Sequence, residues 1–308
     1  MRVHLCGVRG STPAPGAEFL RYGGHTPCVA IVPDGARRPS LILDAGTGIR
    51  TVSGLLGGEA FAGTILLTHL HWDHVQGLPF FAAGDRPDAR ARLLLPEQAD
   101  GSGAEAVLER AMSPPHFPMR PGQLRGDWSF ATLAEGEVEI EGLRVLAREL
   151  PHKGGRTYGY RVSDGSATFT YMPDHCPTAL GAGEDDYGAY HPAALELARA
   201  ADALAHDAQL LGARELSLEA CFGHAAAEYA VALGRRAGAA QTLLFHHRPD
   251  RTDEQLDELA ARFAAAGGGQ VDAERDDGRG NGDDGRHGTA GEPGGEVIVA
   301  AQGMVLEL

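Results

Sequence analysis

Three histidines and an aspartate stand within six positions directly after an apolar segment, and this cluster constrains the chain more than any other feature. The segment GTILLTH, residues 63–69, reads as a buried strand with apolar residues on both faces. The cluster that ends it consists of His69, His71, Asp73 and His74. Imidazole and carboxylate groups are ligands of a borderline metal such as zinc. The sequence therefore predicts a metal-binding loop at a strand end, in preference to a surface loop that happens to be rich in histidine.

Hydrophobic patterning predicts a layered α/β protein, because strands come in runs and later alternate with helices. Strands are expected at 3–8, 27–33, 40–46, 63–69, 91–96, 142–151, 158–164, 167–174, 202–208, 241–247 and 296–308. Helices are expected at 51–56, from 192 to about 201, and at 224–238 and 252–267, the last with Thr252 or Asp253 as its N-cap.

Residues 272–295 differ from the rest of the chain in composition. They are rich in Gly, Asp and Arg and contain no aliphatic or aromatic cluster. Such a segment cannot bury a core and is expected to be disordered. Because strand-like sequence returns at 296, we interpret the chain as one domain over 1–308 with a low-complexity insertion before its last strand.

Charge and cysteine usage narrow the class of protein. The formal net charge is −15, which disfavours electrostatic capture of a long polyanion. The four cysteines form no CxxC pair and suggest reduced thiols of a cytoplasmic protein. The sequence shows no membrane-spanning stretch and no signal peptide at its start.

The motif DAGTG at 44–48, followed by THLHWDH at 68–74, resembles the metallo-β-lactamase superfamily. This resemblance extends over nearly the whole chain, since metal-binding residue types follow later strands in the expected order. They are His152 in ELPHKGG, Asp174 in TYMPDHC and His246 in LLFHHRP. The resemblance implies an α/β fold, an αββα sandwich, with a site for two divalent metal ions, zinc in preference to manganese.

Resemblance also implies how seven ligands divide between the two ions. One ion would be held by His69, His71 and His152, and the other by Asp73, His74 and His246, with Asp174 bridging them. His175 and His247 are neighbours that could be mistaken for ligands. A bridging water would act as the nucleophile, and Asp73 would take or steer its proton.

Two further segments favour the phosphodiesterase branch of the superfamily, close to the tRNA 3′-processing endonucleases. ALAHDAQL places Asp207 where those enzymes have Glu, and GHAAAEYA keeps their histidine as His224. The resemblance implies that His224, oriented by Asp207, helps the leaving oxygen depart. The competing interpretation is that His224 only caps the helix that follows it.

Some positions depart from the bacterial subgroup that the chain otherwise resembles, one sometimes described as similar to cyclic-nucleotide phosphodiesterases. Ala225–Ala226 replaces Ser-Thr, and Arg248 replaces Asp. Both departures lie on the substrate side of the expected site. Arg9, Arg21 and Tyr22 could reach a phosphate or could pin the N-terminal loop, and Trp72 is interpreted as a packing wall.

The favoured function is therefore a dinuclear, zinc-dependent phosphodiesterase acting on a small or exposed phosphodiester such as a cyclic nucleotide. The alternatives are a thioester or carboxylic ester hydrolase on the same metals, and a non-catalytic sensor or accessory protein. A tRNA substrate is disfavoured because 77–123 contains no long basic arm. A membrane partner is not expected, and a homodimer remains open.

Overall fold

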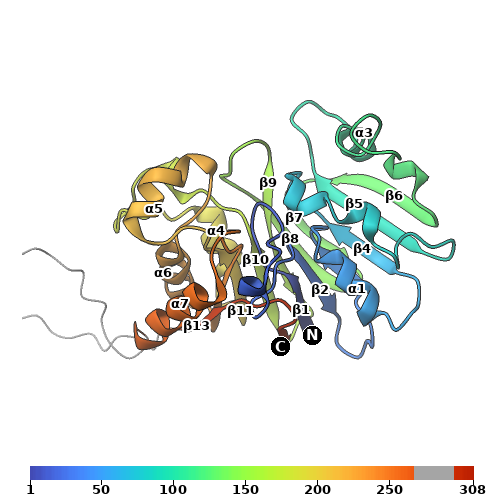
Figure 1. The fold of residues 1–308 in the computed structure, drawn as a ribbon. Coiled ribbons are helices and arrows are strands. Elements are labelled where there is room, and N and C mark those ends of the chain that lie inside the picture. The colour runs from blue at the N-terminus through green and yellow to red at the C-terminus, as the bar shows by residue number, and fades with distance from the viewer. Residues whose placement is uncertain (267–294) are drawn as a thin grey trace, which may run out of the picture.

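The computed structural model describes residues 1–266 and 295–308 and contains two seven-stranded sheets packed face to face (Figure 1). Each sheet is mixed, and helices flank the outer faces. This is the αββα sandwich expected from the sequence.

The first sheet has the strand order β14-β1-β2-β3-β4-β5-β6. Its strands β3 to β6 are parallel to one another, while β1 pairs antiparallel with both β2 and β14. The strands are β1 (Arg2–Gly7), β2 (Cys28–Val32), β3 (Leu41–Leu43), β4 (Ala62–Leu66), β5 (Arg90–Pro96), β6 (Asp127–Leu133) and β14 (Val305–Glu307).

The second sheet has the order β13-β12-β11-β10-β9-β8-β7. Here β10 to β13 are parallel, and β7, β8 and β9 form an antiparallel meander that joins β10. The strands are β7 (Gly136–Ile140), β8 (Leu143–Leu150), β9 (Thr157–Ser163), β10 (Thr168–Met172), β11 (Ala203–Asp207), β12 (Gln241–Phe245) and β13 (Glu296–Val299).

Helices cover the outer face of each sheet, as Figure 1 shows. On the first sheet these are α1 (Ile49–Leu55), the short α2 (Trp72–Val75) and α3 (Ala104–Glu109). On the second they are α4 (Pro192–Ala198), α6 (Ala227–Ala237) and α7 (Asp253–Ala266), with α5 (Gly212–Glu219) beyond them. Short 3₁₀ turns occur at Ala17–Phe19, Leu78–Phe80, Pro121–Gln123, Pro177–Leu180 and Ala220–Phe222.

The main core lies between the sheets and is built from the inward side chains of both. Leu43 and Leu66 of the first sheet pack with Tyr160, Phe169 and Phe245 of the second, all fully buried. Burial of so much apolar area is the main force that joins the two sheets. It fixes the sheet edges against each other, and the loops at one edge carry the candidate site.

Most elements lie where the sequence places them, but the single strand expected at 296–308 is two short strands, β13 in the second sheet and β14 in the first. The insertion expected at 272–295 lies outside the described residues except for Gly295. The sequence interpretation missed β6, β7, α3, α5 and the short α2. All four cysteines are free. In the part of the chain that the structure describes, every helix is too short or too polar to span a bilayer.

Candidate metal centre

The candidate site lies at the carboxyl ends of strands from both sheets. The loop after β4 carries four of the predicted residues, and β8, β10 and β12 are followed by His152, Asp174 and His246. In the second sheet β8, β10 and β12 run in the same direction, so their carboxyl ends meet at one edge, and the carboxyl end of β4 in the first sheet lies beside them. This explains how residues more than a hundred positions apart converge, and it is the usual place for a ligand in a sheet of this kind.

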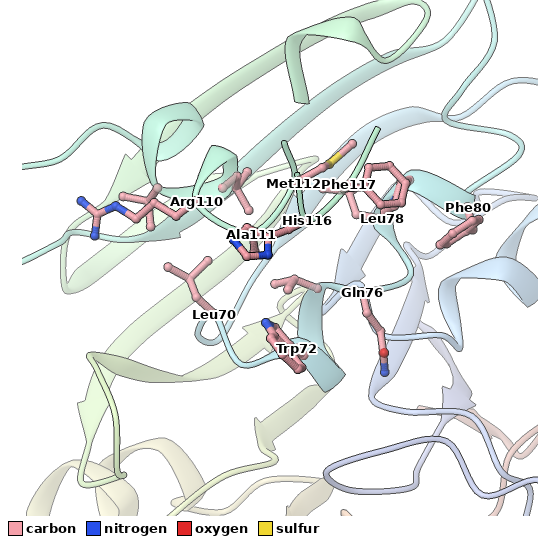
Figure 2. A pocket seen from close by; sticks show the side chains of 14 residues that line it. Leu70, Trp72, Gln76, Leu78, Phe80, Arg110, Ala111, Met112, His116 and Phe117 are labelled. Carbon is pink, nitrogen blue, oxygen red and sulfur yellow. The ribbon is translucent and has the colours of Figure 1, made fainter. Parts of the chain in front are cut away.

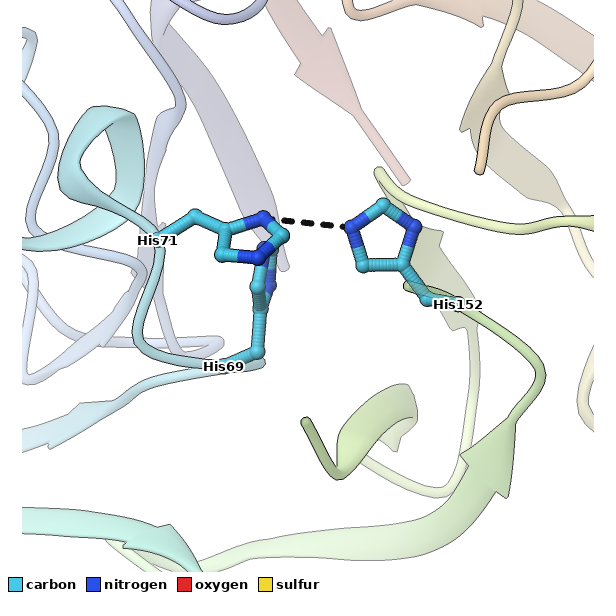
Figure 3. Close-up of side chains that lie close together, drawn as sticks. All are labelled: His69, His71 and His152. Carbon is cyan, nitrogen blue, oxygen red and sulfur yellow. Dashed lines mark hydrogen bonds between the residues drawn. The ribbon is translucent and has the colours of Figure 1, made fainter. Parts of the chain in front are cut away.

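One group of three histidines gathers at the end nearest β8. Nitrogens of His69, His71 and His152 all lie within 4.8 Å of one another. Figure 3 shows His71 and His152 facing each other, with His71 Nδ1 3.2 Å from His152 Nε2. His152 Nδ1 donates to the Gly223 carbonyl oxygen at 2.7 Å, which turns its Nε2 inward.

A second group, comprising Asp73, His74 and His246, meets the same 4.8 Å criterion. Asp174 lies between the two groups. Its Oδ2 is 2.9 Å from His74 Nε2 and 3.5 Å from His246 Nε2, while its Oδ1 is 3.6 Å from His152 Nε2. One carboxylate oxygen thus faces each group, which is the placement required of a bridging ligand.

Several buried polar atoms of this cluster have no hydrogen-bond partner among the described residues. Those that face the cluster are His69 Nε2, His74 Nε2 and Asp174 Oδ2. His74 Nε2 and Asp174 Oδ2 are close but lack hydrogen-bond geometry. Unsatisfied buried polar atoms are costly unless something binds them. Divalent metal ions fit this donor set of imidazole nitrogens and carboxylate oxygens.

The charges of the cluster point the same way. Burial alone would lower the pKa of His74, but the Asp73 and Asp174 carboxylates outweigh it and raise this pKa well above its ordinary value. Burial would raise the pKa of Asp174, yet His246 and His74 hold it well below its usual range. The buried carboxylates therefore demand positive charge at this place, which a metal ion would supply.

Asp44 is a functional residue that the sequence interpretation quoted within a motif without assigning it a role. Its buried carboxylate lies 2.8 Å from His74 Nδ1 and accepts hydrogen bonds from the Thr68 backbone N–H at 2.7 Å and the Tyr171 hydroxyl at 3.0 Å. A carboxylate that binds the ring nitrogen facing away from the metal fixes the tautomer and orientation of a ligand histidine. The signal in the sequence is an aspartate directly after the buried strand β3.

Asp44→Asn is expected to lower metal affinity about 10- to 100-fold, the usual cost of losing a group that orients a ligand. The fold should persist, because Asn has nearly the same shape. Chelator-competition titration of the purified protein measures the change. Asp88→Asn, an exposed carboxylate paired with Arg86, serves as the control and should leave affinity unaltered. Equal affinities for wild type and Asp44→Asn would mean that Asp44 does not orient His74.

His224 lies beside the metal cluster and is held by Asp207. Its Nδ1 is 3.0 Å from Asp207 Oδ2 and 3.7 Å from Asp174 Oδ1, and its ring stacks on His246 at 5.0 Å. Backbone N–H groups of His175, Gln209 and Ala225 donate to Asp207, so this carboxylate is fixed at the end of β11. Burial alone would lower the pKa of His224, but Asp207 outweighs it and the pKa rises to about 9.

The helix-cap interpretation of His224 is wrong. Helix α6 has Ala226 at its N-cap, without a side-chain cap hydrogen bond. Ala225 and Ala226 are fully buried, so the departure from Ser-Thr removes two hydroxyls from a buried position. His224 keeps its place through Asp207 and not through the helix terminus.

The N-terminal loop closes one side of the site. The Ser11 backbone N–H donates to Asp73 Oδ2 at 2.8 Å, and the Ser11 hydroxyl reaches Gln209 Oε1 at 3.2 Å. Arg9 is fully buried and donates to the carbonyl oxygens of Gly23, Arg248 and Arg251. Arg9 therefore pins the loop and is unavailable to a phosphate. Ser11 and Gln209 were missed because only the fold brings them to the site.

Four other residues are separated from the cluster. His247 Nε2 donates to the Ala300 carbonyl oxygen at 2.7 Å, and His175 Nδ1 lies 3.0 Å from His206 Nε2. Arg21 and Tyr22 are bound to Asp257 of α7. These contacts direct all four away from the cluster, so none of them competes with His246 or Asp174.

Trp72 differs from its sequence interpretation as a packing wall. Its side chain is 76% exposed although it lies between two predicted ligands. Successive side chains of this loop point to opposite sides, so the Trp72 side chain points away from the cluster. The Arg248 side chain is not a free substrate-binding group, because it forms ion pairs with Glu219 at 2.6 Å and Asp250 at 2.7 Å.

A sandwich of two mixed sheets, with histidines and aspartates gathered at one edge, defines a protein of the metallo-β-lactamase fold. The family described as the beta-lactamase superfamily domain matches residues 41–247. The chain therefore belongs to this superfamily of metallo-hydrolases.

Solved structures agree on the fold. The metallo-β-lactamase fold protein YhfI from Bacillus subtilis is 17% identical, with a TM-score of 0.63, covering 99% of this chain and 98% of that one. A diphosphatase of the PhnP family is 18% identical, with a TM-score of 0.64 and coverages of 100% and 97%. The short form of human tRNase Z is 17% identical, with a TM-score of 0.61 and coverages of 100% and 99%. A search of curated proteins found no significant match.

Proposed function

We propose that this protein is a dinuclear metal-dependent phosphodiesterase acting on a small or exposed phosphodiester such as a cyclic nucleotide. The observation that carries the proposal is the position of His224, 3.7 Å from Asp174 and held by Asp207. A phosphodiester needs a proton donor for its leaving oxygen. The similar structures named as a diphosphatase and a tRNase support a reaction at phosphorus.

The seven predicted ligands would hold two ions, with Asp174 between them. When bound, the ions supply Lewis-acid stabilisation of the phosphoryl oxygens and lower the pKa of the attacking water. Zinc suits five imidazoles and two carboxylates, and manganese is the alternative. The chain's own residues then have to orient the substrate and move protons.

His224 would donate the proton to the leaving oxygen. Burial opposes the charged form, but the Asp207 carboxylate outweighs it and raises the pKa of His224, which favours the protonated imidazole. Asp207 fixes the ring through Nδ1, which leaves Nε2 free to face the substrate. A positioned acid of this kind contributes roughly 10²–10⁴-fold to turnover.

Asp73 would steer the attacking water or take its proton. Burial would raise the pKa of Asp73, but His74 and His246 lower it well below its usual value, so the carboxylate is ionised. The Ser11 backbone N–H donates to Asp73 Oδ2 at 2.8 Å and fixes the direction in which the carboxylate oxygens point.

The two alternatives lack this support. A thioester hydrolase has a good leaving group and does not need a histidine held in this way. A non-catalytic metal-binding protein does not need an open cleft, yet a cavity of about 360 Å³ opens directly onto His71, Asp73, Asp174 and His224. A tRNA substrate remains disfavoured by the acidic charge.

An activity screen of zinc- and manganese-loaded protein tests the proposal. The substrates are bis-p-nitrophenyl phosphate, cyclic nucleotides, a thioester and a β-lactam. We expect turnover of phosphodiesters above that of the other classes, abolished by a chelator. Faster cleavage of the thioester, or no cleavage by fully metal-loaded protein, would contradict it.

A further inference from the structure

An apolar cavity of about 500 Å³ lies beside the metal cluster and plays no part in the mechanism above. One wall is formed by the loop that carries four of the predicted metal ligands (68–74, the metal loop) and by the turn after α2. The segment 107–117 forms the other wall (Figure 2). Most of its lining is hydrophobic, from Leu70 and Trp72 on one side to Met112 and Phe117 on the other. Cavities of this size and character are typical of small-molecule sites.

Successive side chains of the metal loop point alternately toward the cluster and toward this cavity, so the loop lies between the two. His69, His71 and Asp73 belong to the cluster, whereas Leu70 and Trp72 line the cavity. Leu70 and Trp72 also line the cleft that opens onto the cluster. A molecule held at the metals can therefore extend past Trp72 into the cavity without crossing the protein.

The exposure of Trp72 suggests a ligand. Its indole is 76% exposed, and Phe80, farther along the same wall, is 57% exposed. Phe80 stands edge-on to Phe117 with ring centroids 6.0 Å apart. An exposed aromatic patch at a cavity mouth marks a binding surface more often than a packing need. Flat rings stack favourably on such side chains.

The polar groups of the cavity limit the charge of the ligand. Gln76, Arg110 and His116 are its polar lining side chains, and no carboxylate lines it among the described residues. Arg110 is paired with Asp100 at 3.0 Å. An organic cation would find no counter-charge here, while His116 can hydrogen-bond to the edge of a neutral ring.

We propose that the substrate is a phosphodiester bearing a flat, uncharged aromatic ring, such as a nucleobase, which binds in this cavity against Trp72. The inference rests on the proposed phosphodiesterase function and names its substrate class. The phosphorus would lie at the cluster, and the ring would lie between Trp72 and the wall that carries Phe117.

Binding can be measured without turnover. The chain has two tryptophans, so Trp128→Phe leaves Trp72 as the sole indole. Titration with thymidine 5′-monophosphate should quench the Trp72 fluorescence, whereas deoxyribose 5-phosphate at equal concentration should not. Equal effects of the two compounds would show that the ring does not reach Trp72 and would overturn the inference.

Kinetics test the same idea with the leaving group held constant. The thymidine 5′-(p-nitrophenyl) ester and methyl p-nitrophenyl phosphate both release p-nitrophenolate. We expect kcat/KM to be roughly tenfold or more higher for the thymidine ester, as base stacking on an aromatic side chain implies. Trp72→Ala and Phe117→Ala should reduce this preference toward unity. Leu20→Ala, at an equally exposed apolar position, should retain it.

The outcomes separate the two proposals. Hydrolysis of both esters without a ring preference would overturn the inference and leave the phosphodiesterase function standing. Ring-selective quenching without hydrolysis of any phosphodiester would overturn that function and support the ring site. If octyl p-nitrophenyl phosphate were cleaved with the same kcat/KM as the thymidine ester, the cavity would accept an aliphatic chain as well as an aromatic ring. That result would overturn the inference. Phe117 belongs to the wall formed by 107–117, away from the predicted metal ligands. The result for Phe117→Ala therefore does not depend on an intact metal loop.

Discussion

Replacement of His224 by Ala is expected to lower turnover roughly 10²–10⁴-fold for phosphodiesters with a poor leaving group. The departing alkoxide needs a proton as the P–O bond breaks, and His224, 3.0 Å from Asp207, is placed to give it. The loss should shrink for p-nitrophenolate, since that oxygen needs little help. Turnover of alkyl and p-nitrophenyl esters by wild type and variant measures the difference.

Two controls keep the result of His224→Ala interpretable. Metal content should remain that of the wild type, because His224 is not among the proposed ligands. His4→Ala, on β1 and away from the cluster, should leave turnover unaltered. Loss of an ion would make His224 a ligand, and equal losses on good and poor leaving groups would make it a binding residue. No loss at all would favour thioester hydrolysis.

Asp174→Ala is expected to abolish turnover and to reduce the number of bound ions. Its two oxygens face different groups, at 2.9 Å from His74 and 3.6 Å from His152, so its removal affects both halves of the site. Elemental analysis after metal loading gives the ion count. Turnover of bis-p-nitrophenyl phosphate should fall to the uncatalysed rate.

Companion variants distinguish ligand loss from unfolding. Asp174→Asn keeps the shape and one oxygen and should retain more metal than Asp174→Ala. Asp34→Ala removes an exposed carboxylate that contacts only a neighbouring N–H and should behave as wild type. Thermal unfolding of each variant reports whether the fold survives. A folded Asp174→Ala protein with an unchanged ion count would show that Asp174 bridges nothing.

Local sequence was sufficient for much of the architecture. The strands β4, β10, β11 and β12 were predictable because each is a short segment rich in apolar, β-branched or aromatic residues that ends near a polar residue. The strand β6 was missed because DWSFATL alternates weakly and takes its place from pairing with β5. Such pairing is a tertiary property, and short helices such as α3 and α5 likewise depend on packing.

The metal loop could be found from the sequence because its four metal-binding residues stand within six positions of one another. Residues such as His152 and His246 were found only through resemblance and the order of strands. Their convergence depends on strand direction in two sheets, which single-sequence patterns do not fix. His246 and not His247 faces the cluster because the backbone at His246 adopts a positive φ of 60°, a turn that no local pattern announced.

The sequence by itself determined the residue types of the site, their strand-end positions and the acidic charge of the chain. Only the tertiary structure decided which polar residues support them and which are diverted elsewhere. Asp44 and Ser11 reach the site through contacts across the fold, and Arg9 is diverted into pinning a loop. The exposure of Trp72 was decided in the same way. The physical reason is that burial and hydrogen-bond partners arise from packing between distant segments, whereas composition and spacing are local properties of the chain.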